Sequence, residues 1–560
     1  MGILINFGNQ GRGGYMPGGY NAGNSDHLVL STLGIHWADP TKFAGDWFME
    51  ASPQPHWFFD IITFLGASAG NLGAAYFVFW VAGLVSFGFA TAILSKHWAP
   101  NHPWLLGLAV TFLMSVAPWS SVGTGNAMIA FAVPAVVGGH MVYLFLAYLN
   151  TGRFTAAAVV APLIAVVHVQ QGAVICIFLI AVSTIKWFTR DRSESLGRSL
   201  WVAGLSSLFV TGAIVVFGLT FRPIAAKLQD FVEICDVMIP YHCAAHLWDL
   251  PLVYSSLAII LLSLLTWSFV GTKDRWIWTA TVGLAGVGLA LGLLMDNMHV
   301  PVLGPLFQGT NVYRLGAVVF PFAIFGILVG LFRAGWNWRG AAMAQASFFA
   351  LFLYLGQFAW QLKHATSPKF VLPLVVVTAA VIYIRSHRGR GLGPWAFRAG
   401  VLAFVGLFAL NAVAAHAFTP RGLNTTFISN ADLKAWGKKV EATVPPGEQL
   451  LAAPQWIVKT PSGRGVVADC KDVPYGGAPW QEWQQRISDL GGIDQCKLPY
   501  SQTYLSMSAQ ELDSAAAKYS VEYAVLDISQ KDKFEDLGKL GWHEVLEPFN
   551  DINYYVLSKK

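Results

Sequence analysis

The sequence predicts an α-helical polytopic membrane protein of about 11–13 transmembrane helices with a small α/β domain at its C-terminal end. Three observations lead to this fold class. Hydrophobic residues make up 55% of the chain and charged residues only 12%, about half of the charge that a soluble protein carries. Apolar stretches of roughly 17–25 residues, each long enough to span the hydrocarbon layer, recur between residues 72 and 418. Beyond residue 418 charged residues become frequent, which indicates a separate domain outside the membrane.

About twelve apolar passages set the helix count of the membrane region. They cover residues 72–94, 103–118, 126–148, 155–168, 171–187, 199–220, 253–271, 277–294, 314–333, 340–361, 369–385 and 399–418. The fourth and fifth passages are short and meet at HVQQG, which predicts a helical hairpin that does not cross the membrane fully. The chain therefore divides into an acidic and aromatic outer segment (1–71), a transmembrane helical core (72–418) and an extracytoplasmic α/β domain (419–560).

The last domain is predicted from alternating strand-like and helix-like patterns. GRGVVADC (463–470), VEYAVLDI (521–528) and NYYVLSK (553–559) are typical of strands. APWQEWQQRISDL (478–490) and SAQELDSAAAKY (508–519) carry apolar residues at helical spacing, which predicts amphipathic helices.

Basic residues fix the orientation, because loops rich in lysine and arginine stay in the cytoplasm. Four loops carry them, and all four fall on one side if the passages alternate. These residues are Lys186, Arg190, Arg192 and Arg198; Lys273 and Arg275; Arg333 and Arg339; and Arg385, Arg388, Arg390 and Arg398. The net charge of +5 therefore reflects topology, and we expect no nucleic-acid partner. The outer side receives residues 1–71, the loops 221–252 and 295–313, and the tail.

Because residues 1–71 fall outside, they have to be exported although no signal peptide is apparent. Either the first apolar passage exports its own N-terminus, or an earlier membrane helix precedes the given start. We expect the second.

The cysteines suit an oxidising outer compartment. Cys235 and Cys243 share one outer loop, and Cys470 and Cys496 share the tail. Neither pair has CxxC spacing, so we favour two disulfides over a metal site. Cys176 lies in an apolar passage and is expected to be a small buried residue.

The outer N-terminal segment is rich in titratable side chains. They are Asp26, His27, His36, Asp39, Asp46, Glu50, His56 and Asp60. A carboxylate here could deprotonate a hydroxyl, hold a divalent cation or cap a helix. We expect most of these acids to be structural. Asp26, in NSDHLVL (24–30), is the strongest candidate for chemistry because it is flanked by Asn24 and His27 just ahead of an apolar run.

Several polar side chains interrupt the apolar passages, where they are costly and tend to face a cavity or a partner. They are His140, His168, Gln170, Gln171, Asp296 and Arg314. We expect His140 to be a satisfied buried histidine, whereas for His168 and Gln170 an outer cavity and a structural role are equally open. Arg314 follows GPLFQGTNVY, which contains Gln308, and begins a helix on the outer side. This position favours a phosphate ligand, with a salt bridge to Asp296 as the alternative.

A multi-spanning core, an acid in the first outer loop and an outer C-terminal α/β domain together resemble the GT-C superfamily. These integral membrane glycosyltransferases use polyprenyl-phosphate-linked sugars. The resemblance implies that Asp26 is the loop carboxylate and that Arg314 holds the donor phosphate.

The chain more closely resembles a bacterial multi-spanning membrane family of unknown function. The N-terminal matches are NSDHLVL, DPTKFAGDWF and PHWFFD, and the tail matches are RGVVADCKDVPY and QEWQQR. They cover both ends of the chain well and the middle only through hydropathy and the glutamine-to-arginine element before Arg314. The resemblance implies a location in the bacterial plasma (inner) membrane, with the C-terminal domain outside.

The resemblance to the GT-C superfamily further implies an inverting transfer with Asp26 and Asp46 as the catalytic residues. Asp26 would be the general base, and the leaving phosphate would be stabilised by Arg314 or by a divalent cation, Mg²⁺ or Mn²⁺, shared with Asp46. The partners would be a polyprenyl-phosphate-linked sugar donor, a glycan or glycolipid acceptor, and membrane lipids. The expected substrate-binding residues are His27, His56, His168, Gln170, Gln308, Arg314 and Lys471.

Two other functions remain open. A transporter or flippase of a lipid-linked or anionic substrate would use Arg314 and the intramembrane histidines to line its path, and a scaffold would use the tail to bind a polymer or protein. The sequence contains no HExxH, GxxxxGK[ST] or GxSxG motif, which argues against a zinc protease and against transport by a built-in ATPase.

Overall fold

The computed structural model describes the chain in fifteen stretches. They are residues 20, 22–23, 25–51, 56–116, 132–188, 197, 201, 204–212, 227–248, 250–268, 275–310, 312–333, 424–474, 476–496 and 503–559. The chain forms two compact units. We call the one made of Met1–Tyr20, Phe79–Ala213 and Pro240–Leu423 the helical unit, and the one made of Asn21–Val78, Ile214–Ile239 and Asn424–Lys560 the sheet unit.

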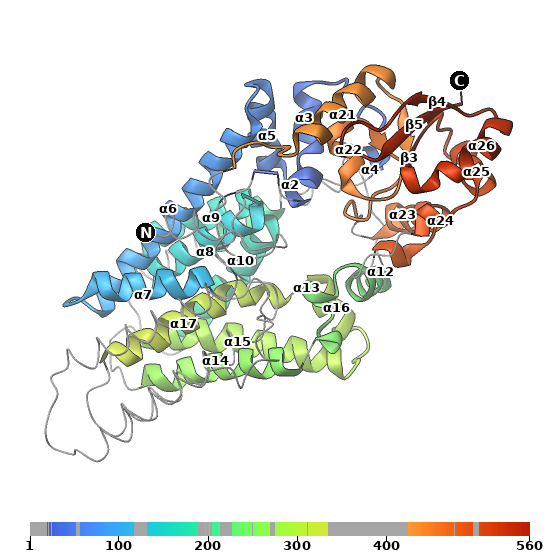
Figure 1. The fold of residues 1–560 in the computed structure, drawn as a ribbon. Helices are drawn as coiled ribbons and strands as arrows, with labels where there is room; N and C mark the ends of the chain where they lie inside the picture. Colours follow the sequence, from blue (N-terminus) through green and yellow to red (C-terminus); the bar gives the residue numbers. More distant parts are fainter. Residues whose placement is uncertain are drawn as a thin grey trace, which may run out of the picture. The chain divides into compact units, whose positions relative to one another are not determined.

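The described part of the helical unit consists of helices (Figure 1). They are α6 (Leu72–Trp98, which begins in the sheet unit), α7 (Pro103–Val116), α8 (Pro134–Asn150), α9 (Phe154–Val167), α10 (Val169–Phe188), α13 (Pro240–Cys243), η2 (Ala245–Leu247), α14 (Leu250–Ser268), α15 (Arg275–Asn297), α16 (Leu303–Thr310), η3 (Val312–Leu315) and α17 (Gly316–Arg333). Of these, α6–α10, α14, α15 and α17 overlap predicted passages, whereas α13, η2 and α16 lie in stretches expected to be loops. Among the described residues, α6 has the length and apolar character needed to cross a membrane, with 27 residues. The passages 340–361, 369–385 and 399–418 lie outside the described residues.

The helices of this unit pack through aromatic side chains. Trp278 of α15 stacks on Phe322 of α17 with ring centroids 4.6 Å apart, and Trp98 meets Trp278 edge to face at 4.8 Å. Gly326 of α17 allows this contact, because a Cβ atom there would lie 2.3 Å from the Trp278 ring. Close-packed aromatic and small residues let neighbouring helices approach without a cavity.

The short hairpin predicted at HVQQG consists of α9 and α10, which are in contact. His168 separates them, with an extended backbone (φ −149°, ψ 104°). Its N–H still donates to the Ile164 carbonyl at 2.8 Å. This is the last helical hydrogen bond of α9, and the chain turns at His168.

The sheet unit combines segments from three parts of the sequence. The first part contributes α2 (Ser25–Leu30), α3 (Thr32–Ala38), α4 (Trp47–Ala51) and α5 (Trp57–Ser68), and the second contributes α12 (Leu228–Glu233) and the π-helix η1 (Ile234–Met238). The tail contributes α21 (Ala431–Thr443), β1 (Gln449–Leu451), α22 (Trp456–Ser462), β2 (Gly465–Val466), α23 (Gly477–Asp489), η5 (Ile493–Cys496), α24 (Thr503–Ser506), α25 (Ala509–Lys518), β3 (Tyr523–Asp527), η6 (Ile528–Lys533), α26 (Phe534–Lys539), β4 (His543–Leu546) and β5 (Tyr554–Ser558).

A five-stranded mixed sheet of order β2-β1-β3-β5-β4 organises the tail. β1 pairs in parallel with β2 and β3, whereas β5 pairs antiparallel with β3 and β4. Successive residues of β3 enter opposite cores: Ala524 and Leu526 lie in one, and Tyr523 and Val525 in the other. Helices cover both faces, which is why this strand reads as a continuous apolar run.

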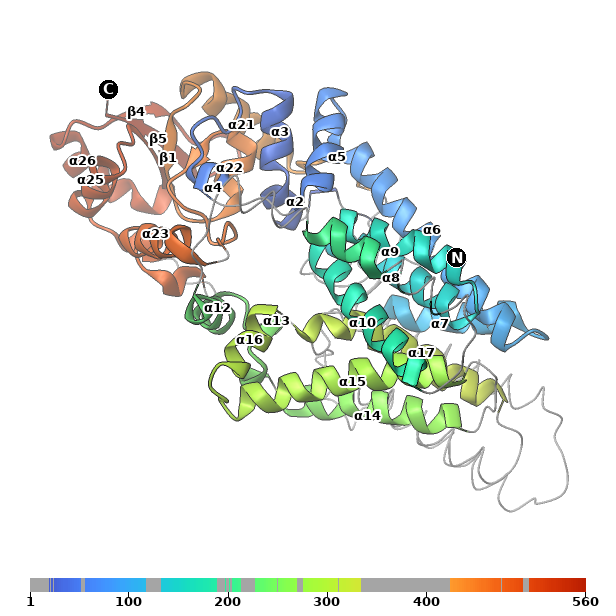
Figure 2. The ribbon, with the colours of Figure 1, turned by 180° about the vertical axis from the view of Figure 1, so that it is seen from behind.

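The N-terminal segment belongs to this fold. Trp47 of α4 is buried in the same core as Trp480 and Trp483 of α23. Figures 1 and 2 show α2, α3 and α4, in blue, beside α21 and α22, in orange, although these helices come from opposite ends of the chain. The N-terminal segment and the tail therefore fold together.

Candidate active site

Residues 25–30 of the NSDHLVL motif form the short helix α2, with Asp26 in its first turn. A carboxylate is favourable there because the free N–H groups of a helix start carry partial positive charge. The Asp26 side chain is 40% exposed, and its Oδ1 atom lies 3.5 Å from Nζ of Lys471. The pair thus joins the N-terminal motif NSDHLVL to the tail motif RGVVADCKDVPY.

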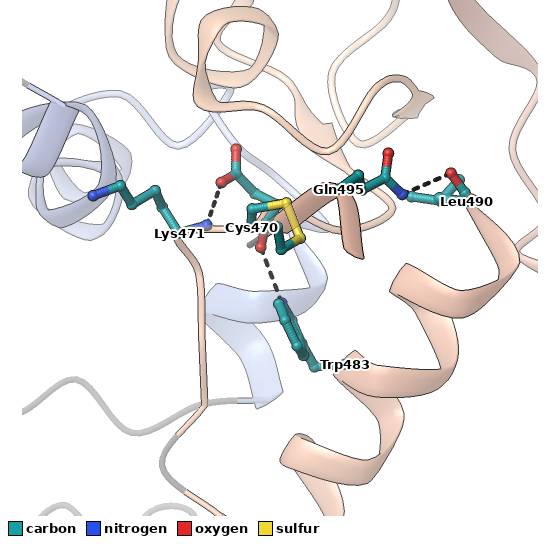
Figure 3. The surroundings of a disulfide bond; sticks show 7 residues. Cys470, Lys471, Trp483, Leu490 and Gln495 are labelled. Atoms are coloured by element: carbon teal, nitrogen blue, oxygen red, sulfur yellow. Dashed lines mark hydrogen bonds between the residues drawn. A yellow bond between two sulfur atoms is a disulfide. The ribbon is translucent and has the colours of Figure 1, made fainter. Parts of the chain in front are cut away.

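Lys471 is held by the stretch that surrounds it (Figure 3). Its backbone N–H donates to Oδ1 of Asp469 at 2.7 Å, and the Asp469 carbonyl accepts from Nε1 of Trp483 at 2.9 Å. The preceding residue, Cys470, forms a disulfide with Cys496. Figure 3 shows the Lys471 side chain extending from this anchored backbone.

The other two cysteines of the predicted disulfides, Cys235 and Cys243, are also disulfide-bonded. Cys176 is free and buried, as expected.

Asp46 occupies a different environment from Asp26. It is 1% exposed, its Oδ1 accepts from the Met49 N–H at 3.0 Å at the start of α4, and both of its oxygens lie 3.0 Å from Nζ of Lys459. Lys459 also donates to Oδ2 of Asp472 at 2.5 Å. Asp46 is therefore one side of a buried ion cluster, a position that favours a structural role over the catalytic role we expected.

Charge in this cluster is unbalanced, since Asp46, Asp469 and Asp472 surround one buried lysine. Burial raises the pKa of the Asp472 carboxyl to about 7, although Lys459 opposes the shift, and burial also raises the pKa of Asp469. Burial disfavours the charge on Lys459, but Asp46 and Asp472 outweigh it and raise the pKa of this ammonium group. Lys459 therefore stays charged at neutral pH.

The expected divalent cation does not fit these carboxylates. Each carboxylate has a lysine ammonium group beside it instead: Nζ of Lys471 lies 3.5 Å from Oδ1 of Asp26, and Nζ of Lys459 lies 3.0 Å from both oxygens of Asp46. Within the described part of the chain, no three Asp, Glu, His or Cys side chains lie together as a metal site.

His27 faces the interior rather than a substrate. Its side chain is 0% exposed and stacks on the ring of Tyr76 at 4.7 Å, and Tyr76 stacks on Phe59 at 4.9 Å. The Tyr76 hydroxyl lies 2.6 Å from Oγ of Ser31 and 2.8 Å from Oγ1 of Thr63. His27 is thus part of the packing between α2, α5 and α6. His56 is half-buried at the residue before α5.

Several hydrogen bonds join α2 and the loop that follows α3 to the tail. Oγ1 of Thr460 donates to the Leu28 carbonyl at 2.7 Å, and the Phe43 N–H donates to the Gly463 carbonyl at 2.8 Å. Gly45 (φ 70°) lies against the backbone of Gly447, where a Cβ atom would be 2.9 Å from the carbonyl oxygen. This close approach requires glycine. Backbone contacts as well as side chains therefore hold the segment that carries Asp26 against the tail.

The remaining expected site residues belong to the helical unit. Nδ1 of His168 accepts from the Gln171 N–H at 3.2 Å, and the Gln171 amide donates to the Ala135 carbonyl of α8 at 2.7 Å. Gln170 is half-buried, Gln308 is buried within α16, and Arg314 is half-buried in η3.

Asp296, the expected alternative partner of Arg314, interacts with His246 instead. Its Oδ2 atom lies 2.9 Å from the backbone nitrogen of His246 and 3.1 Å from Nδ1 of the same residue. No sequence pattern pointed to His246 or Lys459, whereas Asp469 and Asp472 flank Lys471 within the motif RGVVADCKDVPY.

Comparison with known proteins gives one family match and several structural likenesses. Residues 431–490 match the domain of unknown function DUF6798, which spans the part of the tail that contains Lys459 and Lys471. No curated protein matches the chain.

The chain is similar in fold to several solved structures at low identity. One is ArnT from Cupriavidus metallidurans in the apo state, with 12% identity, 97% of this chain and 94% of that chain covered, and a TM-score of 0.46. Another is the same protein bound to undecaprenyl phosphate, with 12% identity, coverage of 100% and 96%, and a TM-score of 0.46. A third is oligosaccharyltransferase AglB from Archaeoglobus fulgidus in complex with an inhibitory peptide and a dolichol-phosphate, with 11% identity, coverage of 95% and 69%, and a TM-score of 0.42.

Proposed function

We propose that this chain is an inverting membrane glycosyltransferase of the GT-C type. In this proposal it transfers a sugar from a polyprenyl-phosphate donor to a cell-envelope glycan or glycolipid on the outer face of the bacterial plasma membrane. The supporting observation is the half-exposed pair formed by Asp26 and Lys471 at 3.5 Å. It joins a carboxylate able to accept a proton with a cation able to attract a phosphate, both on the part of the chain that is expected to lie outside.

The reaction follows from these two side chains. The acceptor hydroxyl attacks the anomeric carbon while the carboxylate of Asp26 takes the hydroxyl proton. A new C–O bond forms as the bond between the anomeric carbon and the phosphate oxygen breaks, and the electron pair leaves on the lipid phosphate. Direct displacement inverts the anomeric centre. The donor phosphate would compete with Asp26 for Lys471. Lys471 would then bind the phosphate, and the carboxylate of Asp26 would be free to accept a proton.

The other expected residues have unequal support in this proposal. Arg314, in the helical unit, remains a candidate for holding the donor phosphate. Asp46 and His27 are assigned to the fold, because the first is ion-paired with Lys459 and the second is stacked between aromatic rings.

The test is a glycolipid and surface-polysaccharide profile of cells that lack this protein. The cells are complemented with the wild type, with Asp26→Asn, or with Glu50→Gln as a matched control, because Glu50 is an exposed acid on α4 of the same segment. We expect the wild type and Glu50→Gln to restore a missing glycan and Asp26→Asn, present at equal level in the membrane, to leave it missing.

Full restoration by Asp26→Asn would refute the proposed role of this carboxylate. Transport or flipping of a lipid-linked substrate would then be the better account. That account predicts loss of function at Arg314 or His168 instead of Asp26.

A further inference from the structure

Lys459 is a buried cation of the sheet unit that the proposed reaction does not use. Its side chain is 3% exposed and contacts Asp46 at 3.0 Å and Asp472 at 2.5 Å. A fully buried ammonium group is costly unless carboxylates surround it, so this arrangement is maintained only while both partners stay in place. The three residues therefore form a rigid link between the segments that carry them.

Lys459 links the two segments that carry Asp26 and Lys471. Asp46 belongs to the N-terminal segment that carries Asp26, whereas Asp472 directly follows Lys471. The residue after Lys459, Thr460, donates a hydrogen bond to the Leu28 carbonyl of α2, two positions beyond Asp26. Helix α22 thus contacts α2 on one side and the Lys471 stretch on the other.

Side chains of the stretch Asp469-Cys470-Lys471-Asp472 have partners on different elements. The carboxyl of Asp472 contacts Lys459, and Asp469 lies near enough to raise the pKa of this lysine, whereas Lys471 between them contacts Asp26. The Cys470–Cys496 disulfide fixes the middle of the stretch from a further direction (Figure 3). Once the acids are held by Lys459, the Lys471 backbone has little freedom to move away from α2.

We propose that Lys459 is a positioning residue, whose charge sets the separation of Asp26 and Lys471 by holding Asp46 on one side and Asp472 on the other. This inference rests on the proposed function for its effect on catalysis, but the positioning itself is measurable without any reaction.

The first measurement is the reactivity of the Lys471 amine in the full-length protein in detergent. An amine-acylating reagent is applied under limiting conditions, and mass spectrometry follows the labelling rate of Lys471. We expect faster labelling in Lys459→Met than in the wild type, because Lys471 is no longer held against Asp26. The matched control is Lys518→Met, which removes an exposed lysine of the same domain paired with Asp489 at 2.5 Å and should leave the rate unchanged.

A second variant guards against misfolding of Lys459→Met. Asp472→Ala releases the Lys471 stretch but leaves Lys459 paired with Asp46, so it disturbs the buried cluster less. It should raise the labelling rate of Lys471 in the same direction. An unchanged rate in both variants would overturn the inference.

The second measurement is a double-mutant cycle on the transfer reaction, with the complementation strains supplying membranes. We expect Lys459→Met to reduce kcat by about 100-fold, the size typical of a small misplacement of reacting groups. If Lys459 acts through Lys471, the same substitution should have little further effect in a Lys471→Met background. If the losses of kcat from the two substitutions are fully additive, the inference is overturned, because Lys459 would then act independently of Lys471. If the wild type shows no transfer, the proposed function fails, and the labelling rates still decide whether Lys459 positions Lys471.

Discussion

Removal of the Cys470–Cys496 disulfide tests how the tail is held together next to Lys471. The two cysteines are separated by 26 residues in the sequence, and both are nearly inaccessible, at 7% and 6% exposure. For a loop of this length the chain-entropy relation gives a loss of about 3.5 kcal/mol in the free energy of unfolding. For a unit of roughly 220 residues, each kcal/mol lowers the melting temperature by about 2–4 °C, so we expect a decrease of about 7–14 °C.

The variant is Cys470→Ala/Cys496→Ala, with Cys176→Ala as the control because that thiol is buried and unpaired. The assay is pulse proteolysis of the purified full-length protein at increasing temperature, following peptides from residues 465–496 by mass spectrometry. These peptides report the sheet unit alone, so the membrane helices do not dominate the signal. An unchanged midpoint, with the disulfide verified in the wild type, would refute the reasoning that this bond constrains the unfolded tail.

Three further predictions follow from single contacts. Replacing Gly326 with valine should destabilise the helical unit by about 1–3 kcal/mol, measured as a lower melting temperature in detergent, because the new Cβ would lie 2.3 Å from the Trp278 ring. Asp230→Ala should destabilise the sheet unit by about 1–3 kcal/mol, detected as faster proteolysis of the tail, since Asp230 accepts from the backbone N–H groups of Gly477 and Lys227 at 2.7 and 2.9 Å. The pKa of Asp472 is raised to about 7 in the folded protein, whereas an unfolded aspartate titrates near pH 4, so stability should fall as the pH rises from about 4 to about 7. Asp472→Asn should reduce the slope of melting temperature against pH in this range. An equal slope in both proteins would contradict the assignment.

Regular patterns in the tail made five of the thirteen elements in its described part predictable from sequence: β2, α23, α25, β3 and β5. The apolar run of VEYAVLDI corresponds to β3, and the spacing in APWQEWQQRISDL corresponds to α23. Ser508 and Glu511 form the capping box that begins α25, inside the predicted helix 508–519. Short elements gave no such signal: β1 has three residues, and α22 contains Pro461.

The candidate site was only partly predictable, for reasons of geometry. Neighbouring helical residues point about 100° apart, so Asp26 can face Lys471 while His27 enters the aromatic core, although both looked alike as candidates. Asp46 resembled a reactive carboxylate because its partner, Lys459, lies in the tail, and no local pattern reveals a pair at that separation. Spacing could place Lys471 in a motif but could not show what it contacts.

The common fold of the outer N-terminal segment and the tail limits how the chain can be threaded through the membrane. Residues 21–78, 214–239 and 424–560 form one compact unit. If the chain is threaded as the sequence predicts, all three emerge on the same face of the bilayer. The chain must then cross an even number of times between the first and second of these segments, and again between the second and third. Six predicted apolar passages lie between the first and second segments and six between the second and third, which satisfies this parity. The parity is the same if the hairpin of the fourth and fifth passages does not cross. Insertion or loss of a single crossing in either half would strand one segment on the wrong side and leave Asp26 without its lysine.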